Sequence, residues 1–162
     1  MLNALGIDRP ATLAYPEYVY FTQQDFFAKV EPRLAVGATV DREGMTLAQL
    51  GEVLKGFGVL VTVQPADALN VDQFRQLLRD RLGAGAGFML MNYNRKLMGE
   101  MGGGHWSPLA AYHPGSDTVL ILDGARYKYP PVWVPVATLL EAGQLPDSGS
   151  GKSRGLLIVR RP

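Results

Sequence analysis

His105 and Asp123 are the two residues of this chain whose types and spacing favour acid–base chemistry. His105 follows three glycines in GGGHWSPLAAYH (102–113), and Asp123 ends the apolar run TVLILD (118–123). A carboxylate beside an imidazole fixes one tautomer of the ring and stabilises its cation, which is the orienting role in a nucleophile–base–acid triad. Each residue also has a structural interpretation, His105 as a satisfied core histidine and Asp123 as a turn residue. The spacing by itself leaves both interpretations open.

Such a pair needs a nucleophile, and the 162 residues include no cysteine. Disulfides and thiolate metal sites are excluded for the same reason. The second histidine, His113, stands beside Pro114 in a turn and is expected to be solvent-exposed. Neither the triple glycine nor GSGKSRG (149–155) has the full spacing of a phosphate-binding P-loop. The chemistry therefore depends on His105.

Other residues have simpler interpretations. Arg126 and Lys128 are two residues apart, so on a strand they would face the same side, either to grip a carboxylate or as a solvated edge. The large apolar residues Met89, Met91, Trp106 and Trp133 are expected in the core or lining a site rather than forming a cofactor box. The chain has 16 basic and 15 acidic residues and no basic stripe with interleaved aromatics, which argues against nucleic-acid binding. It has no apolar run long enough to span a membrane and no basic leader, so a cytoplasmic location is expected.

The elements that must position His105 and Asp123 follow from capping and periodicity. Thr22, Thr46 and Asn70 are candidate N-caps, and Asp25 and Gln49 stand at the capping-box position after Thr22 and Thr46. They predict helices over QQDFFAKV (23–30), LAQLGEVLKGFG (47–58) and VDQFRQLLRDRLG (71–83), and ATLLEAG (137–143) reads as a fourth. Strands are predicted over 59–64, 88–94, 105–113, 118–123 and 155–161, with a hairpin turn at 113–117. The aromatic segment 11–21 is expected to be irregular and packed on the core, KYPPVWVP (128–135) to be a proline-rich crossing, and MLNALG to be the end of a helix closed by Gly6.

Helices that precede a mostly antiparallel sheet indicate an α+β domain. At 162 residues, with 47 % hydrophobic and 19 % charged residues, one domain with a substantial core is expected.

The stretch GGGHWSPLAAYHPGSDTVLILDGARYKYPPVWVPV resembles the signature of the phytochelatin synthases, a papain-like group of transpeptidases. The similarity extends through Leu139–Ala142 to GKSRGLLIVRRP and includes LNALGID at the front, whereas residues 11–85 match weakly. This similarity implies a papain-like fold over 1–162. The chain resembles the bacterial single-domain members of the family, which lack the cysteine-rich metal-sensing region of the plant type.

By this resemblance, His105 is the catalytic base and Asp123 its orienting acid, and their spacing of eighteen residues agrees with the family. Arg126 and Arg154 match positions near substrate carboxylates, and Asp147 and Asn92 match recurrent polar positions near the site. Gly104, directly before His105, belongs to the glycine run that lets other groups approach the backbone closely.

The main departure from the family is the missing nucleophile. In phytochelatin synthases, the cysteine lies near the start of a helix whose later part reads like VLNAL, so it is expected about two turns upstream of Met1. The glutamine that helps form the oxyanion hole is absent too. The sequence is therefore interpreted as an N-terminally truncated domain, inactive by itself, with self-association possible through the surface that the missing helix would leave.

Two functions follow from the resemblance. The first is a γ-glutamylcysteine dipeptidyl transpeptidase or peptidase that cleaves the Cys–Gly bond of glutathione through a cysteine thioester. The alternative is a non-catalytic papain-fold module that binds γ-glutamyl peptides, or half of a split enzyme. Glutathione and γ-glutamylcysteine peptides are the expected partners. No cofactor with clear protein ligands is expected, and cadmium or zinc would enter only as thiolate complexes of glutathione.

Overall fold

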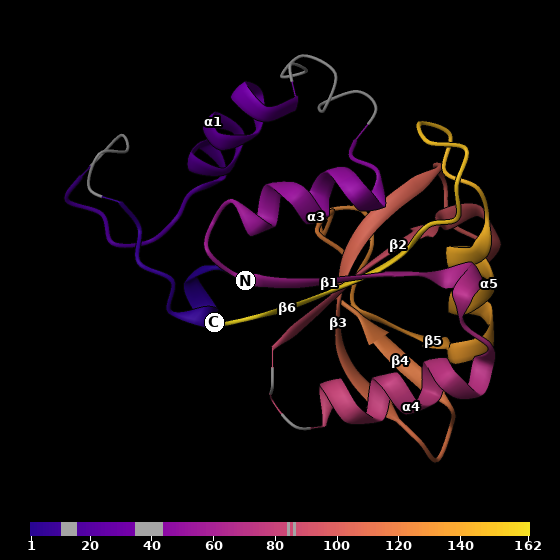
Figure 1. Cartoon of the computed structure of the whole chain (residues 1–162). Helices are drawn as coiled ribbons and strands as arrows, with labels where there is room; N and C mark the ends of the chain where they lie inside the picture. The colour runs from indigo at the N-terminus through magenta and orange to yellow at the C-terminus, as the bar shows by residue number, and fades with distance from the viewer. Residues whose placement is uncertain (11–15, 35–43, 84, 86) are drawn as a thin grey trace.

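One six-stranded sheet forms the centre of the fold. The structure, a computed structural model, describes residues 1–10, 16–34, 44–83, 85 and 87–162. The strand order is β1-β6-β2-β3-β4-β5, and every neighbouring pair is antiparallel (Figure 1). The strands are β1 (Leu60–Pro65), β2 (Phe88–Asn94), β3 (Gly104–His113), β4 (Thr118–Ile121), β5 (Val132–Pro135) and β6 (Gly155–Arg160). The predicted α+β class and the antiparallel sheet are confirmed.

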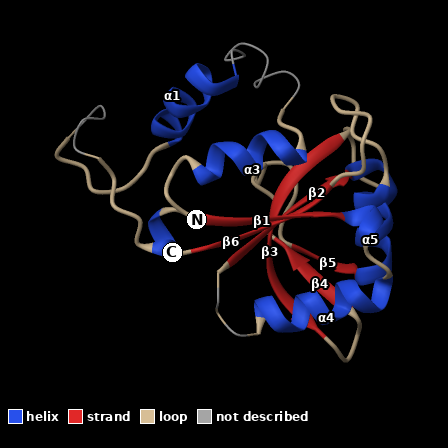
Figure 2. Ribbon diagram, viewed as in Figure 1, coloured by secondary structure: helices blue, strands red, loops and turns tan. Residues whose placement is uncertain are grey.

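Helices cover both faces of the sheet (Figure 2). The α-helices are α1 (Gln23–Leu34), α3 (Leu47–Lys55), α4 (Val71–Leu82) and α5 (Val136–Gln144), and the short 3-10 helices are η1 (Asn3–Leu5), η2 (Ala66–Ala68) and η3 (Arg95–Met98). Helix α3 packs on β1 and β6, whereas α4 packs on β2 and β3 and α5 on β2 and β5 from the other side. None of the helices in the described ranges is long and apolar enough to cross a membrane.

Two apolar cores result from this layering. One lies between the sheet and α4 and α5, and includes Phe74, Leu78, Met91 and Leu139. The other lies under α3, and includes Val53, Leu54, Leu157 and Val159. Strand β6 contributes to both cores, which explains why GLLIVR is apolar without alternation.

The helix starts and the helix end predicted from capping residues and Gly6 are confirmed. Thr46 with Gln49 and Asn70 with Gln73 form complete capping boxes at the starts of α3 and α4. The Thr22 hydroxyl accepts from the Asp25 backbone N–H at 3.3 Å, at the start of α1. At the front of the chain, MLNALG contains η1, which ends at Gly6 in the left-handed conformation (φ 64°). The helical ending predicted there is confirmed as a 3-10 turn.

Three predictions about local structure were wrong. The segment KYPPVWVP is not only a crossing, because its second half forms edge strand β5, paired with β4. An edge strand tolerates flanking prolines because one side of its backbone needs no ladder partner. On this edge Trp133 is 48 % exposed, so it is not a core residue. Residues 16–20 are exposed rather than packed on the core, whereas Phe21 packs against the core under α3 as predicted. Residues 11–15 of that segment lie outside the described residues.

Candidate active site

The hairpin of β3 and β4 brings His105 and Asp123 together. His105 is the second residue of β3, and Asp123 comes two residues after β4, which pairs antiparallel with β3. The imidazole Nε2 of His105 lies 2.9 Å from Oδ1 of Asp123. Because an ionised carboxylate can only accept, Nε2 carries the proton and Nδ1 holds the lone pair. Within the described part of the chain, Nδ1 makes no hydrogen bond, and the ring is 27 % exposed.

Asp123 is buried and held from three sides. Its side chain is 2 % exposed. Oδ1 accepts from His105 and, at 2.7 Å, from the backbone N–H of Ala125, whereas Oδ2 forms an ion pair with the guanidinium of Arg95. A carboxylate bound in this way cannot rotate away from the imidazole without losing charge-assisted bonds. Its position is therefore suited to orienting the His105 ring.

The surroundings make the His105 cation less favourable. Burial lowers the pKa of His105 below its ordinary value, and the positive charge of Arg95 lowers it further, while Asp123 acts in the opposite direction. The ring also stands edge-on to Tyr93, with the two ring centres 6.0 Å apart. A neutral imidazole with an open nitrogen is the form that accepts a proton from a nucleophile.

Arg95 was not predicted from the sequence, although it lies against the pair. It is the first residue of η3, 7 % exposed, with its guanidinium 4.7 Å from the centre of the Tyr129 ring. Its Nε lies 3.7 Å from Oε2 of Glu100, and neither atom makes a hydrogen bond. Burial raises the pKa of Glu100. No local pattern distinguishes this arginine from a solvated one, because its partners lie up to 34 residues away.

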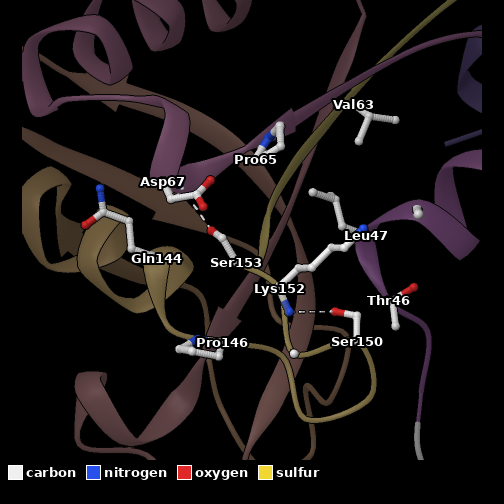
Figure 3. A pocket seen from close by; sticks show the side chains of 12 residues that line it. Thr46, Leu47, Val63, Pro65, Asp67, Gln144, Pro146, Ser150, Lys152 and Ser153 are labelled. Atoms are coloured by element: carbon white, nitrogen blue, oxygen red, sulfur yellow. Dashed lines mark hydrogen bonds between the residues drawn. The ribbon is translucent and has the colours of Figure 1, made fainter.

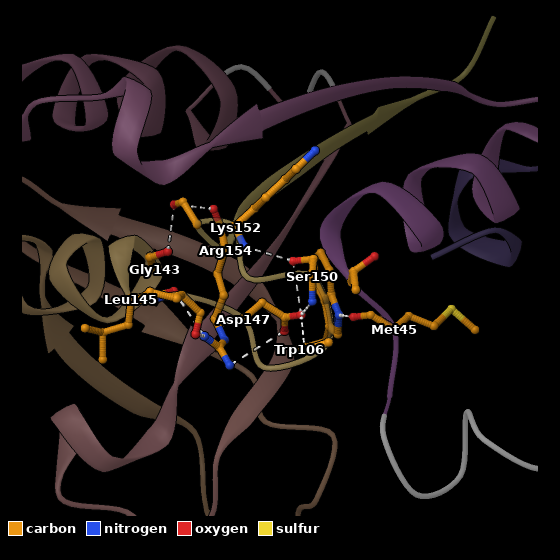
Figure 4. Close-up of polar contacts among 12 residues, drawn as sticks. Met45, Trp106, Gly143, Leu145, Asp147, Ser150, Lys152 and Arg154 are labelled. Atoms are coloured by element: carbon orange, nitrogen blue, oxygen red, sulfur yellow. Dashed lines mark hydrogen bonds and ion pairs between the residues drawn. The ribbon is translucent and has the colours of Figure 1, made fainter.

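A second group of predicted residues adjoins His105 at the start of β3. Arg154 is buried, and its Nη1 donates to the carbonyl of Leu145 at 3.0 Å and to that of Pro146. Its Nη2 lies 3.6 Å from a carboxylate oxygen of Asp147 (Figure 4). A Cβ on Gly104 would lie 2.8 Å from Nη2, closer than side chains tolerate. Glycine is therefore needed for the guanidinium to lie against the strand beside His105.

Asn92 lies on β2 between these two groups. In the sheet it is opposite Trp106 of β3 on one side and Gly155 of β6 on the other, so it neighbours the residues next to His105 and Arg154. Asn92 is 2 % exposed, and its Oδ1 makes no hydrogen bond among the described residues. The Nε of Arg154 is likewise buried without a partner. A buried unpaired acceptor and donor need polar partners, which a ligand can supply.

The structure separates Arg126 from this arrangement. Arg126 and Lys128 lie in a turn, not on a strand, so the expectation that they share a strand face was wrong. Both side chains are exposed, and no described contact joins Arg126 to His105. His113 is exposed as predicted, and its ring bonds Ser116 within the hairpin turn. The described residues contain no group of three or more metal-ligating side chains.

Comparisons with known proteins agree with the sequence signature. The family model described as phytochelatin synthase matches residues 1–156. A glutathione gamma-glutamylcysteinyltransferase 1 of Lotus japonicus is 32 % identical over 162 residues, which is 100 % of this chain and 31 % of that protein. The enzyme of the same name from Triticum aestivum is 34 % identical over 161 residues, 99 % of this chain and 31 % of that protein. The glutathione gamma-glutamylcysteinyltransferase of Schizosaccharomyces pombe is 28 % identical over 120 residues, 74 % of this chain and 29 % of that protein. The chain thus spans about a third of the length of these relatives.

Proposed function

Because this chain belongs to the phytochelatin synthase family, we propose that it carries the acid–base half of a site that cleaves the Cys–Gly bond of glutathione. The observation that carries the proposal is the oriented pair: Nε2 of His105 is 2.9 Å from Asp123, and Nδ1 is open. A papain-like fold is part of the proposal, supported by the α+β architecture and the family match.

The nucleophile in this proposal is a cysteine supplied by polypeptide outside the 162 residues, since the chain contains none. Its thiol gives its proton to Nδ1 of His105, and the thiolate attacks the carbonyl carbon of the Cys–Gly amide. The imidazolium then protonates the glycine nitrogen, which leaves as the amine, and a γ-glutamylcysteinyl thioester remains. Water or the α-amine of the glutamyl residue of a second glutathione then attacks the thioester carbonyl, His105 accepts the proton of that attacking group, and the cysteine leaves as a thiolate. Water gives free γ-glutamylcysteine, and the amine gives a new amide bond.

The lowered pKa of His105 fits both halves of this cycle. A ring that is neutral near pH 7 can take the thiol proton, and the resulting imidazolium is acidic enough to give it to the departing amine. Asp123, ionised and ion-paired with Arg95, stabilises that cation without taking the proton.

The γ-glutamyl end of the substrate is assigned to the polar group beside His105. The unpaired Nε of Arg154 can donate to the glutamyl carboxylate, and Asp147 or the Oδ1 of Asn92 can accept from its amine. Arg126 stays a weaker candidate for a second carboxylate, because it lies exposed in its turn. Heavy-metal ions would be carried by the substrate as thiolate complexes; this too stays a prediction.

Two apolar hollows next to η1 support the proposal that a further segment, carrying the cysteine, packs there. One, of about 270 Å³, is lined by residues that include Leu2, Phe26 and Leu90. Another, of about 580 Å³, is lined by residues that include Leu5, Leu90, Pro108 and Leu122. An amphipathic helix with the cysteine at its N-terminus would cover this apolar surface. If nothing covers it, we expect the chain to self-associate there.

The alternative function is a non-catalytic γ-glutamyl-peptide binding module or one half of a split enzyme, favoured by the absence of cysteine from the 162 residues. One experiment distinguishes the two functions. The gene is expressed as the longest open reading frame that contains these codons, and glycine release from glutathione is measured, with the 162-residue chain as control. We expect release by the longer protein and none by the control.

Replacement of His105 by asparagine in the longer protein should lower the rate at least about 100-fold, the usual contribution of a general base. A longer frame without cysteine, or a His105→Asn protein with an unchanged rate, would contradict the catalytic proposal. Glutathione binding by the 162-residue chain together with no release by the longer protein would support the binding module.

A further inference from the structure

A further cavity is bordered by the 146–153 loop, which also carries Asp147. Its volume is about 510 Å³, within the range of small-molecule sites. It lies between the start of α3, the end of β1, η2 and the 146–153 loop (Figure 3). Its walls include Leu47, Val63, Pro65 and Pro146. None of the residues predicted from the sequence to bind substrate lines it.

The few charged groups of this cavity stand at opposite ends. Lys152 extends from the loop toward Leu47 at one end, and Asp67 and Gln144 stand at the other (Figure 3). Among the described residues, neither the ammonium of Lys152 nor the carboxylate of Asp67 makes a side-chain hydrogen bond or ion pair. The Ser153 side chain lies between Asp67 and Lys152, and Ser150 lies on the side of Lys152 away from Asp67 (Figure 3). A cation and an anion separated by an apolar wall are complementary to a ligand with a carboxylate at one end and an amine at the other.

We propose that this cavity binds a short zwitterionic peptide, with a carboxylate on Lys152 and an amine near Asp67. The identification of this peptide as a γ-glutamyl peptide such as glutathione rests on the proposed function. The apolar wall suits the peptide's aliphatic stem, and the open, exposed rim suits a ligand that exchanges rapidly. The site is separate from the one at Arg154 and Asn92.

The loop links the two sites physically. Oδ1 of Asp147 accepts from the backbone N–H groups of Gly149 and Ser150, each at 3.0 Å, whereas the other carboxylate oxygen faces Arg154 (Figure 4). Ser150 in turn accepts from the backbone N–H of Lys152 at 3.3 Å. The cavity rim and the guanidinium beside Gly104 are therefore built on one short hydrogen-bonded loop.

The test is an amide-resolved NMR titration of the 162-residue chain with glutathione. We expect saturable shifts at Leu47, Ala48, Val63 and Lys152. Lys152→Ala should weaken the apparent affinity at these amides about tenfold, as loss of a charge-assisted contact does. N-acetylglutathione lacks the free amine, so it should bind the cavity of the unaltered chain about tenfold more weakly than glutathione does. The Asp67→Asn variant should bind N-acetylglutathione no more weakly than the unaltered chain binds it. Lys55→Ala, at an exposed lysine outside the cavity, is the matched control and should bind as the unaltered chain does.

Amides at Gly104 and Asn92 report the other site in the same titration. Saturable shifts there, with none at the four cavity amides, would overturn the cavity proposal and leave the proposed function intact. Shifts confined to the cavity amides would support the cavity proposal and contradict the assigned substrate site. Equal affinities for Lys152→Ala, Lys55→Ala and the unaltered chain would also overturn it.

Discussion

Replacing Asp123 by asparagine tests the network that holds His105. The substitution keeps the shape but removes the charge that Arg95 pairs with, and both side chains are buried, at 2 % and 7 % exposure. Removal of one partner of a buried pair costs about 3–5 kcal/mol, because the other charge stays uncompensated. Because the Arg95 guanidinium still lies over the face of the Tyr129 ring in the variant, we expect a loss of free energy of unfolding at the lower end of this range, about 3 kcal/mol. For a domain of this size, that lowers Tm by roughly 6–12 °C.

A double-mutant cycle separates this pair from general damage to the core. Arg95→Met should destabilise by a similar amount, about 3 kcal/mol, since it leaves Asp123 without its guanidinium partner. The double variant Arg95→Met with Asp123→Asn leaves neither member of this pair facing an uncompensated charge and should lose only about 3 kcal/mol in total. Glu100 loses its contact with Arg95 in the single and the double variant alike, so that loss cancels in the cycle. The coupling free energy is then about 3 kcal/mol, at the upper end of the range for contacting residues.

Urea or thermal unfolding of the four proteins at pH 7 gives the cycle. Glu52→Gln is the control, because Glu52 pairs with Lys55 on the surface and should change the free energy of unfolding by less than about 0.5 kcal/mol. If the two single changes add to within about 0.5 kcal/mol in the double variant, Arg95 and Asp123 do not form the buried pair described above, and the account of how His105 is oriented fails.

Four further predictions follow from the site and the fold. Gly104→Ala should displace the Arg154 guanidinium, since the new Cβ would lie 2.8 Å from Nη2, and calorimetry should detect at least about tenfold weaker glutathione binding with an unchanged far-UV spectrum. The NMR titration of His105 should give a pKa below the ordinary value, and Arg95→Met should raise it, because that cation opposes protonation; a lower pKa in the variant would contradict this. Since the folded-state pKa of His105 is below that of the unfolded chain, this group should lower the free energy of unfolding as the pH falls below about 6.5. Thr46→Ala removes the side-chain cap of α3 and should cost about 1 kcal/mol in denaturant unfolding, whereas Thr46→Ser should cost less than half of that.

Features set by neighbouring residues were predictable from the sequence. The capping box at Thr46 and the left-handed Gly6 depend on contacts within three or four positions, so composition and spacing reveal them. The 113–117 turn joins two neighbouring strands and forms as predicted, because its proline, glycine, serine and aspartate favour a turn. Edge strand β5 was missed because its prolines argue against a strand, a rule that holds for central strands and fails at an edge.

Features that depend on distant segments were not predictable in the same way. Arg95 reaches Asp123 across 28 positions, and nothing near it in the sequence indicates that it is buried. Arg126 was placed on a strand because its spacing from Lys128 fits one, but the chain turns there. Local propensity carries no information on which strand becomes the neighbour of which.

For this protein, the sequence by itself determined the family, the α+β class and the two residues of the hairpin pair, because a long signature and a short loop specify them locally. Only the tertiary structure decided what surrounds that pair. The pairing of β2 with both β3 and β6 places Asn92 between the neighbours of His105 and Arg154, and it brings Arg154 against Gly104, fifty positions earlier in the chain. The physical reason is that sheet register is a collective result of burying two apolar faces at once, which no single stretch of sequence encodes.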